Sequence, residues 1–99
     1  MDPIALDWGP ATAEFASEEK NSATHILQHD LTSPEKAERS ARFALARVRW
    51  FAAKMPPGAT QEVWFDDRGQ AVPAGAREAI RDRLTPHVAG ILFFSEGEA

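Results

Sequence analysis

Two neighbouring carboxylates and an arginine follow the most strand-like stretch of the chain. Residues 61–66 are dense in β-branched and aromatic side chains, which favour strands, and Asp66, Asp67 and Arg68 lie at the end of this stretch. In open α/β sheets, ligands bind at the carboxyl ends of the strands. Two carboxylates there could hold a divalent metal ion, and Arg68 could bind a phosphate. The alternative is a polar turn, in which Asp67 bonds its own backbone and Gly69 takes a positive φ.

Two histidines, His25 and His29, are four residues apart, which places them on one side of the chain in either a strand or a helix. A protein metal site needs further ligands, usually a carboxylate or a third histidine, and His87 is far away in sequence. The spacing also lacks the glutamate of the H-E-x-x-H zinc motif. We therefore predict no metal site and interpret both histidines as surface or core residues, with acid–base catalysis as the alternative.

The triplet Glu18-Glu19-Lys20 contains the E-x-K part of the pattern by which nucleases of the restriction-endonuclease type hold a metal ion and activate water. It lies in a stretch without apolar alternation, so we interpret it as the solvated end of a helix. The chain has no glycine-rich phosphate loop, no G-x-S-x-G elbow and no dinucleotide fingerprint. No cofactor is therefore predicted, and no set of catalytic residues marks the chain as an enzyme.

Aromatic and basic side chains are the candidates for contact with a partner, because interfaces are enriched in tryptophan and arginine. Trp8 either docks on the core or stays exposed for a partner, and docking is the interpretation that we favour. The six basic residues of 34–55 do not form one stripe, so we predict a solvated flank rather than a nucleic-acid-binding surface. The predicted partner-binding residues are Trp8, Trp50, Trp64, Arg42 and Arg49.

One long helix over residues 33–55 must position many of these groups. Ser33 can cap its first turn, Pro34 suits the first helical position, and the Pro-Pro-Gly that follows Met55 ends it. At helical spacing, two apolar ridges run along it. One ridge is Ala37, Ala41, Ala44, Leu45, Val48, Phe51, Ala52 and Met55, and the other is Phe43, Ala46, Trp50 and Ala53. We therefore expect the rest of the chain to pack on this helix, and we do not expect Trp50 and Phe51 both to be exposed.

Strands and helices are predicted to alternate after the first 21 residues. The predicted elements are a strand over 22–31, a helix over 33–55, a strand over 61–66, a helix over 73–84 and a strand over 90–94. This order predicts right-handed crossovers and an α/β fold: a small, mostly parallel three-stranded sheet (β-α-β-α-β) packed on one long central helix. Residues 63–65 and 91–93 should then lie side by side in the same direction. For residues 22–31, a helix continuing from Ser17 remains the alternative.

The whole chain, residues 1–99, is predicted to be a single domain with its α/β core over 22–94. An N-terminal arm and a short helix over residues 11–20 precede the core, and the tail 95–99 is expected to fray. The last strand is a continuous apolar run, so we expect it to be buried on both faces.

Composition excludes several classes of protein. The chain has no cysteine, which excludes disulfides and thiolate metal sites and fits a reducing compartment. No apolar run approaches the roughly 20 residues of a membrane span, and the N-terminus carries acids where an export signal would carry bases. We therefore predict a cytoplasmic protein outside the membrane. The net charge of −4 disfavours general nucleic-acid binding, because that affinity comes mostly from neutralising phosphates.

The stretch from Pro56 to Phe94 resembles a pattern near the ends of bacterial polymorphic (contact-dependent) toxin proteins. The matching parts are PPGATQEVWFDDRGQAV with its D-x-R-G-Q turn, a helix containing REAIRDRL, and the apolar strand GILFF. The resemblance covers residues 56–94 only. It implies a nuclease-type toxin domain that cleaves tRNA or DNA, with Asp66 and Arg68 as the suggested catalytic residues.

The hypothesis that we favour is a small protein-binding domain that acts as an inhibitor, adaptor or regulator, of a kind that phages or mobile elements also encode. Small size, acidic charge, three tryptophans and the lack of a catalytic constellation favour it. The alternative is the nuclease-type toxin domain, with Asp66, Asp67 and Arg68 as candidate catalytic residues. A third hypothesis is a subunit of a homo-oligomer.

Overall fold

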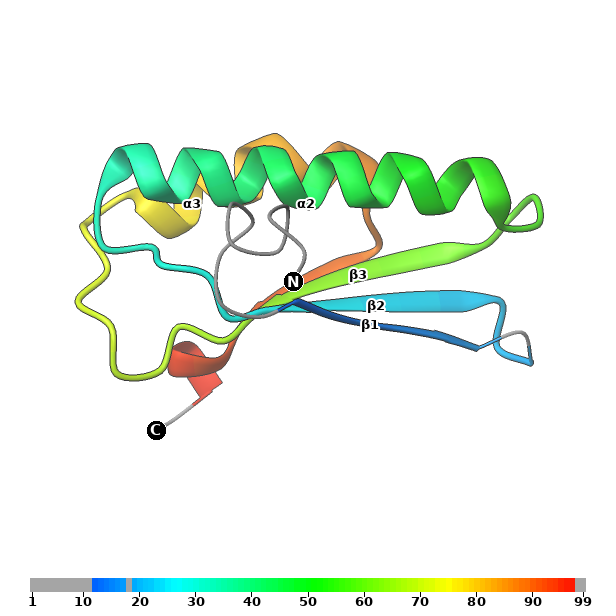
Figure 1. The fold of residues 1–99 in the computed structure, drawn as a ribbon, viewed down its shortest axis with the longest axis horizontal. Coiled ribbons are helices and arrows are strands. Elements are labelled where there is room, and N and C mark those ends of the chain that lie inside the picture. The colour runs from blue at the N-terminus through cyan, green and yellow to red at the C-terminus, as the bar shows by residue number, and fades with distance from the viewer. Residues whose placement is uncertain (1–11, 18, 98–99) are drawn as a thin grey trace, which may run out of the picture.

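The structure is a computed structural model, and it describes residues 12–17 and 19–97. The described residues form an α/β fold. Its elements in chain order (Figure 1) are β1 (Thr12–Ser17), β2 (Ser22–Leu27), α2 (Pro34–Lys54), β3 (Thr60–Phe65), α3 (Ala76–Leu84), the 3-10 helix η1 (Thr85–His87), β4 (Gly90–Phe93) and the 3-10 helix η2 (Phe94–Gly97).

The strands form one mixed sheet in the order β1-β2-β3-β4. Strands β2, β3 and β4 run parallel, whereas β1 pairs antiparallel with β2. Helix α2 connects β2 to β3, α3 connects β3 to β4, and both helices lie on the same side of the sheet (Figure 1). Val63 pairs with Ile91 and Phe65 with Phe93 in parallel register, which confirms the predicted direction and adjacency of these two strands.

The helix predicted over residues 11–20 is wrong. Thr12–Ser17 forms strand β1 instead, so the sheet has four strands rather than three. Every residue of β1 pairs with a residue of β2, and Asn21 in the turn between them takes a left-handed φ of 51°. Pairing along a whole strand outweighs local helix propensity, which is why the local pattern misled. The predicted arm over residues 1–9, with Trp8, lies outside the described residues.

Further boundaries also differ from the prediction. Strand β2 ends at Leu27 rather than at residue 31, and Asp30 forms a side-chain turn with the backbone two residues on. Strand β3 is Thr60–Phe65 rather than 61–66, and β4 ends at Phe93 rather than at residue 94. Helix α3 begins at Ala76 rather than at residue 73, because Gly75 takes a left-handed φ of 82°. Of the tail 95–99 predicted to fray, residues 95–97 belong to η2 (Phe94–Gly97), and residues 98–99 lie outside the described residues.

Helix α2 begins and ends where the sequence predicts. The Ser33 side chain accepts a hydrogen bond of 3.2 Å from the backbone N–H of Lys36, and Pro34 is the first helical residue. Met55 is already extended, as expected for a residue that precedes proline. In residues 12–17 and 19–97, no helix is both long enough and apolar enough to cross a membrane.

The first of the two apolar ridges predicted on α2 is mostly buried, although Ala52 is exposed, whereas in the second ridge only Phe43 packs against the core. In the second ridge, Trp50 is 50% exposed, and Ala46 and Ala53 are exposed as well. Phe51 is half-buried, so the expectation that Trp50 and Phe51 would not both be exposed is confirmed. The buried face of α2 consists mostly of small residues, which let the helix lie close to the sheet: Ala37, Ser40, Ala41, Ala44 and Val48.

The core lies between one face of the sheet and the two helices. Phe65 and Phe93 stack with their ring centroids 5.1 Å apart, and Ile80 and Leu84 of α3 are buried in the same cluster. Leu92 of β4 is 44% exposed on the opposite face, so the prediction that this strand is buried on both faces is wrong. The reason is the placement of α2 and α3, which both cover the same side (Figure 1).

Candidate functional site: the open face of the sheet

The first of the two carboxylates after β3 is paired within its own turn. Asp66 accepts two hydrogen bonds from the Arg68 guanidinium, at 2.7 and 2.8 Å, and one from the Gln28 side-chain amide at 3.0 Å. The hydrogen bonds from Arg68 and then from Gln28 hold the pKa of Asp66 well below its ordinary value. Asp66 is therefore ionised, and its charge is balanced by a neighbouring arginine.

Asp67 points to different partners and links three elements. It is fully buried, and it accepts hydrogen bonds from Arg77 Nε of α3 at 3.0 Å and from the backbone N–H and hydroxyl of Ser95 at 2.9 and 2.8 Å. Burial raises the pKa of Asp67, but the hydrogen bonds from Ser95 and Arg77 outweigh burial and lower the pKa below its ordinary value. Asp67 thus joins the end of β3 to α3 and η2.

The candidate catalytic residues Asp66, Asp67 and Arg68 come together in one turn, but as members of ion pairs. A divalent metal ion would have to compete with two arginines for the same carboxylate oxygens. Within residues 12–17 and 19–97, no three His, Cys, Asp or Glu side chains are grouped so that they could hold a metal ion. Gly69 takes a φ of 78°, so the geometry favours the polar turn.

His29 is a core histidine. It is buried, and its two ring nitrogens lie 2.8 Å from the Thr12 hydroxyl and 2.9 Å from the Ser40 hydroxyl. Burial lowers the pKa of His29, so its ring is neutral at pH 7. His25 has other partners, so the two predicted histidines do not share a site.

His25 is the centre of a second buried polar network. It is fully buried on the inner face of the sheet, where Nδ1 lies 2.6 Å from Glu14 Oε2 and Nε2 lies 2.7 Å from Gln61 Oε1. Gln61 donates from its amide nitrogen to the Val48 carbonyl of α2 at 2.9 Å. Arg47 of α2 donates to both oxygens of Glu14.

These partners place an oxygen beside each ring nitrogen of His25. The Gln61 amide nitrogen must face the Val48 carbonyl, which leaves the Gln61 oxygen facing His25 Nε2. The Glu14 carboxylate faces the other ring nitrogen. Burial raises the pKa of Glu14, but the hydrogen bonds from Arg47 and His25 outweigh it and lower the pKa.

Sequence reasoning missed Glu14 because the predicted helix gave this residue no strand partner. The signal that could have found it is the pairing of two six-residue strands across a short turn, which sets Glu14 opposite His25. Of the E-x-K triplet, Glu19 and Lys20 lie in that turn and are exposed, and Glu18 lies outside the described residues.

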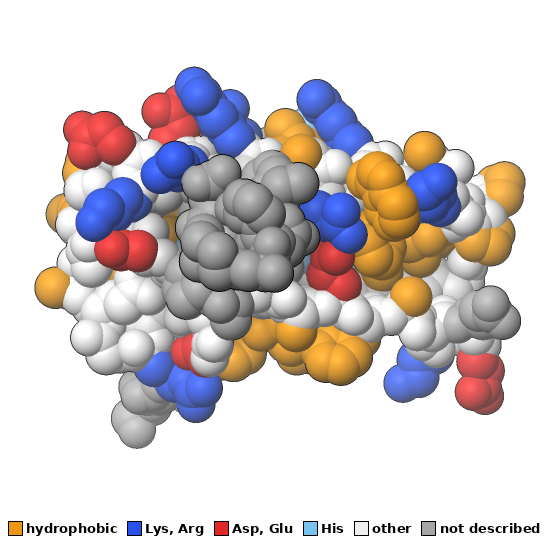
Figure 2. All heavy atoms as spheres, viewed as in Figure 1, with side chains coloured by type: hydrophobic (Ala, Val, Ile, Leu, Met, Phe, Trp, Pro, Cys, Tyr) orange, Lys and Arg blue, Asp and Glu red, His pale blue; other side chains and the backbone are white. Residues whose placement is uncertain are grey.

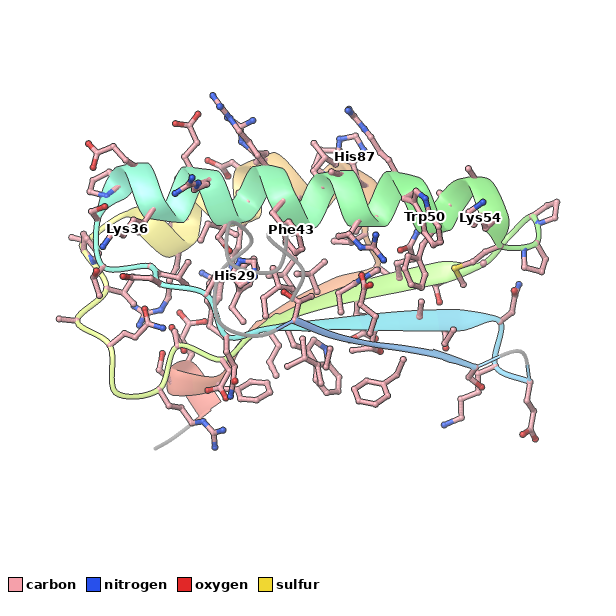
Figure 3. The ribbon with its side chains drawn as sticks, viewed as in Figure 1. His29, Lys36, Phe43, Trp50, Lys54 and His87 are labelled. Atoms are coloured by element: carbon pink, nitrogen blue, oxygen red, sulfur yellow. The ribbon has the colours of Figure 1, made fainter. Side chains whose placement is uncertain are left out.

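Trp50, one of the predicted partner-binding residues, lies near the C-terminal end of α2 beside Lys54 (Figure 3). Arg47 and Lys54 lie over its ring, 4.9 and 4.8 Å from the centroid, as cation–π contacts. Arg42 forms an exposed ion pair with a glutamate one turn earlier in α2, and Arg49 is exposed. Arg42 and Arg49 therefore lie on the solvated side of the helix.

Trp64, the remaining candidate, lies on the side of the sheet that neither α2 nor α3 covers, and we call this side the open face. Side chains alternate along a strand, so each strand contributes every second residue to it. Glu62 is the only charged residue among these outward-facing strand positions. In Figure 2, hydrophobic side chains gather along the lower edge of the molecule, beneath the strands. The open face consists of Ala13, Phe15, Ser17, Ser22, Thr24, Ile26, Thr60, Glu62, Trp64, Gly90 and Leu92.

The register of the sheet arranges these residues in rows across the strands. The first row is apolar throughout and consists of Ala13, Ile26, Trp64 and Leu92. The second row consists of Phe15, Thr24, Glu62 and Gly90. Phe15 is 62% exposed, and the ring of Phe94 in η2, 6.3 Å from that of Trp64, extends the apolar area beyond the first row.

The part of the chain that resembles polymorphic toxins contains the turn at Asp66 and the strand that carries Leu92. In the structure this turn is an ion-paired link between elements, and the strand forms one edge of the open face. The resemblance stays a prediction, since comparisons of the chain with protein-family models, with curated proteins and with solved structures found no match.

Proposed function

We propose that this domain works by binding another protein, as an inhibitor, adaptor or regulator, and that the open face of the sheet is its binding surface. One observation carries the proposal: the sheet presents an apolar row to solvent on the side that neither helix covers. Parallel strands normally have both faces covered by other elements. The open face is therefore where a second layer of protein is expected.

Two exposed side chains supply much of the driving force. Phe15 is 62% exposed and Leu92 is 44% exposed, and burying the remaining apolar area of each against a partner is favourable by about 25 cal/mol per Å². Contiguous exposed apolar surface of this kind marks interaction sites on soluble proteins. At one end of the first row, a hollow of about 660 Å³ could receive an apolar side chain of the partner, and it is lined by Arg68, Leu92, Phe93, Phe94 and Gly97.

The charge of the open face favours a protein over a nucleic acid or a membrane. Its only charged strand residue is Glu62, whereas nucleic acids and anionic lipid surfaces are bound by clustered lysine and arginine. Glu62 also accepts a hydrogen bond of 2.9 Å from Trp64 Nε1, so its carboxylate lies beside the Trp64 ring. The partner is expected to present an apolar, nearly uncharged surface.

No observation favours the nuclease alternative. Its candidate residues Asp66 and Asp67 each bind an arginine, and the fully buried Asp67 is held by Ser95 as well. A general base or metal ligand needs a free oxygen directed at a substrate, and these oxygens are directed at partners within the fold.

A photo-crosslinking amino acid at Thr24, on the open face, tests this function in cells and with the purified domain. A matched chain carries it at Ala46, which is exposed on α2. We expect one discrete protein adduct from Thr24 and none from Ala46. The purified adduct protein should bind the wild-type domain, and Leu92→Asp should weaken that binding about tenfold or more, because it places a charge in the apolar row.

Ala46→Asp is the matched control and should leave the affinity unchanged, with circular dichroism showing that both variants are folded. Equal binding by Leu92→Asp and Ala46→Asp would show that the partner binds elsewhere and would refute the open face as the binding surface.

A further inference from the structure

We infer that strand β1 opens from the edge of the sheet and closes again as a unit, while the other three strands and both helices stay folded. The observation behind it is that β1 pairs with β2 along its whole length and yet supplies no residue to the hydrophobic core. The opening is a property of the chain alone and does not depend on the proposed function.

The four strands differ in burial. None of the six residues of β1, all of which the structure describes, is buried, and its one large apolar side chain, Phe15, is 62% exposed. Each of the other strands buries at least one large apolar side chain in the core, among them Leu27 of β2, Phe65 of β3 and Phe93 of β4. Segments with few buried apolar contacts open at the lowest free energy. We therefore expect β1 to open before the other strands.

The side of β1 that faces α2 carries no large apolar side chain. Side chains alternate along a strand, so this side consists of Thr12, Glu14 and Ala16. The Thr12 hydroxyl lies 2.8 Å from Nε2 of the buried His29. This contact is a hydrogen bond, and water can replace a hydrogen-bond partner when the strand leaves.

Glu14 makes the strongest contacts between β1 and the rest of the fold. Its carboxylate lies 2.6 Å from His25 Nδ1 and accepts a hydrogen bond of 2.9 Å from Arg47 Nε of α2. These contacts orient β1 and hold it closed. They are polar, however, so opening costs only their net value over hydrogen bonds to water and does not cost a packed apolar cluster.

The rest of the fold keeps its core when β1 leaves. In the sheet that the described residues form, β1 lies at one edge and β2 stays paired with β3. The core cluster lies entirely between Leu27 and Phe93. Three parallel strands under two helices have the hydrophobic face that an independent sheet needs. The open form is therefore a folded state and not an unfolded chain.

Opening changes the open face of the sheet, because β1 carries Ala13 and Phe15. A partner that contacts Phe15 would bind only the closed form, and its apparent affinity would fall in proportion to the closed fraction. This consequence rests on the proposed function, whereas the opening itself does not.

Backbone amides of β2 report separately on its two neighbours. The Leu27 carbonyl accepts a hydrogen bond of 2.8 Å from the Asp66 N–H that follows β3, so the Leu27 backbone points to β3. Backbone groups alternate along a strand, so the His25 N–H also points to β3, whereas those of Thr24 and Ile26 point to β1. Adjacent residues of one strand therefore distinguish opening of β1 from unfolding of the sheet.

Amide hydrogen exchange of the full chain, followed by NMR, tests the opening. After correction for intrinsic rates, we expect exchange to be at least about a hundredfold faster at Thr24 and Ile26 than at His25 and Leu27. Equal rates at the four amides would show that β1 leaves only when the whole sheet unfolds, and that result would overturn the inference.

Ile80→Val separates local opening from global unfolding. Ile80 is buried in the core, and the smaller side chain lowers the stability of the open and closed forms alike. We expect exchange at His25 and Leu27 to become about fivefold faster, with no change at Thr24 and Ile26. An equal rise at all four amides would contradict separate opening of β1.

A disulfide between β1 and β2 tests whether release of β1 causes the fast exchange. Ala16 and Ala23 face each other as a non-hydrogen-bonded pair, with Cα atoms about 4.5 Å apart, which suits a disulfide. The chain has no other cysteine. With Ala16→Cys and Ala23→Cys oxidised, exchange at Thr24 and Ile26 should slow to the rate at Leu27, and reduction should restore it. Unchanged exchange in the oxidised chain would refute opening of β1 as its cause.

Glu14→Gln tests the polar contacts that hold β1 closed. We expect exchange at Thr24 and Ile26 to become about thirtyfold faster, whereas Glu19→Gln, at an exposed turn position, should leave it unchanged. Equal rates in the two variants would show that these contacts do not hold the strand. All of these measurements use the free chain, so a failure to find a partner for the open face leaves their outcome unaffected.

Discussion

At the scale of single residues, the inner face of the sheet holds a buried polar network. His25 lies between Glu14 and Gln61, and Arg47 binds the same Glu14 carboxylate from α2. A buried polar or charged group is costly unless it is hydrogen-bonded. Within residues 12–17 and 19–97, every buried side-chain nitrogen and oxygen has a hydrogen-bond partner, so this cost is met.

Glu14→Gln tests the network. The variant keeps the shape of the side chain but removes the carboxylate charge that binds Arg47 and faces His25, so we expect the free energy of unfolding to fall by about 2–3 kcal/mol. Urea unfolding followed by tryptophan fluorescence measures the change. Glu19→Gln, at an exposed turn position of the same hairpin, should change stability by less than about 0.5 kcal/mol.

Nitrogen-15 NMR of the wild-type histidine rings checks the other buried histidine. We expect a proton on only one ring nitrogen of His29 at neutral pH, because burial lowers its pKa. Equal destabilisation by Glu14→Gln and Glu19→Gln would show that the network around His25 contributes nothing specific to stability.

The residue types at the carboxyl end of β3 could be read from the sequence, but their roles could not. Asp66, Asp67 and Arg68 do meet in one turn, as their adjacency requires. Arg77 and Ser95, which hold Asp67, come from segments that only folding brings beside it. A carboxylate without a partner and one bound to a distant arginine look the same in sequence, and they differ in chemistry.

At the scale of elements, local signals predicted the helices better than the first strand. The capping serine, the proline at the first helical position and the proline after Met55 act within a few residues of α2, so they could be read without the fold. Strand β1 depends on hydrogen bonds to β2, and a helix remains plausible for it until that partner is known. Helix α3 begins later than predicted because Gly75, with its left-handed φ, belongs to the turn before it.

Ser33→Ala tests the local signal at the start of α2. Removing the side-chain oxygen leaves the backbone N–H of Lys36 without its 3.2 Å partner, so we expect a loss of about 1 kcal/mol in the free energy of unfolding. Thermal and urea unfolding measure it. Thr85→Ala removes an exposed hydroxyl at the end of α3 and should cost less than about 0.5 kcal/mol. Equal losses in the two variants would mean that the cap contributes nothing specific.

At the scale of the whole molecule, the described residues form two layers, a sheet and a pair of helices on one side of it (Figure 1). The other side carries an apolar row, and the proposed partner would supply a third layer. Two ionised carboxyls bind partners on other elements. They connect the sheet to the helices and to η2. Glu14 links β1 to α2, and Asp67 links β3 to α3 and η2.

These carboxyls predict loss of stability in acid. Glu14, Asp66 and Asp67 have pKa values below the ordinary values in the folded chain, so the unfolded chain takes up protons first as the pH falls. The stability that they contribute is therefore complete above the ordinary values and is lost as the pH falls through the lowered ones. We expect the free energy of unfolding to decrease steadily below about pH 4.5.

Urea unfolding at a series of pH values measures this slope. Asp67→Asn should be less stable at neutral pH and should show a shallower slope in acid, because one of the linked carboxyls is gone. Asp82→Asn, on the exposed side of α3, should keep the wild-type slope. A wild-type stability that does not change between neutral pH and pH 3 would contradict the assignment.

The sequence by itself determined the alternation of strands and helices after residue 21 and the ends of α2, because capping residues, prolines and apolar runs act within a few residues along the chain. The parallel pairing of β3 with β4 was predicted from that alternation through the rule of right-handed crossovers. Only the tertiary structure decided that β1 joins the sheet, that His25 meets Glu14, that both aspartates bind arginines and that one face of the sheet stays open. Each of these depends on contacts between segments far apart in sequence, because hydrogen-bond partners and covering layers are chosen by the packing of the whole chain.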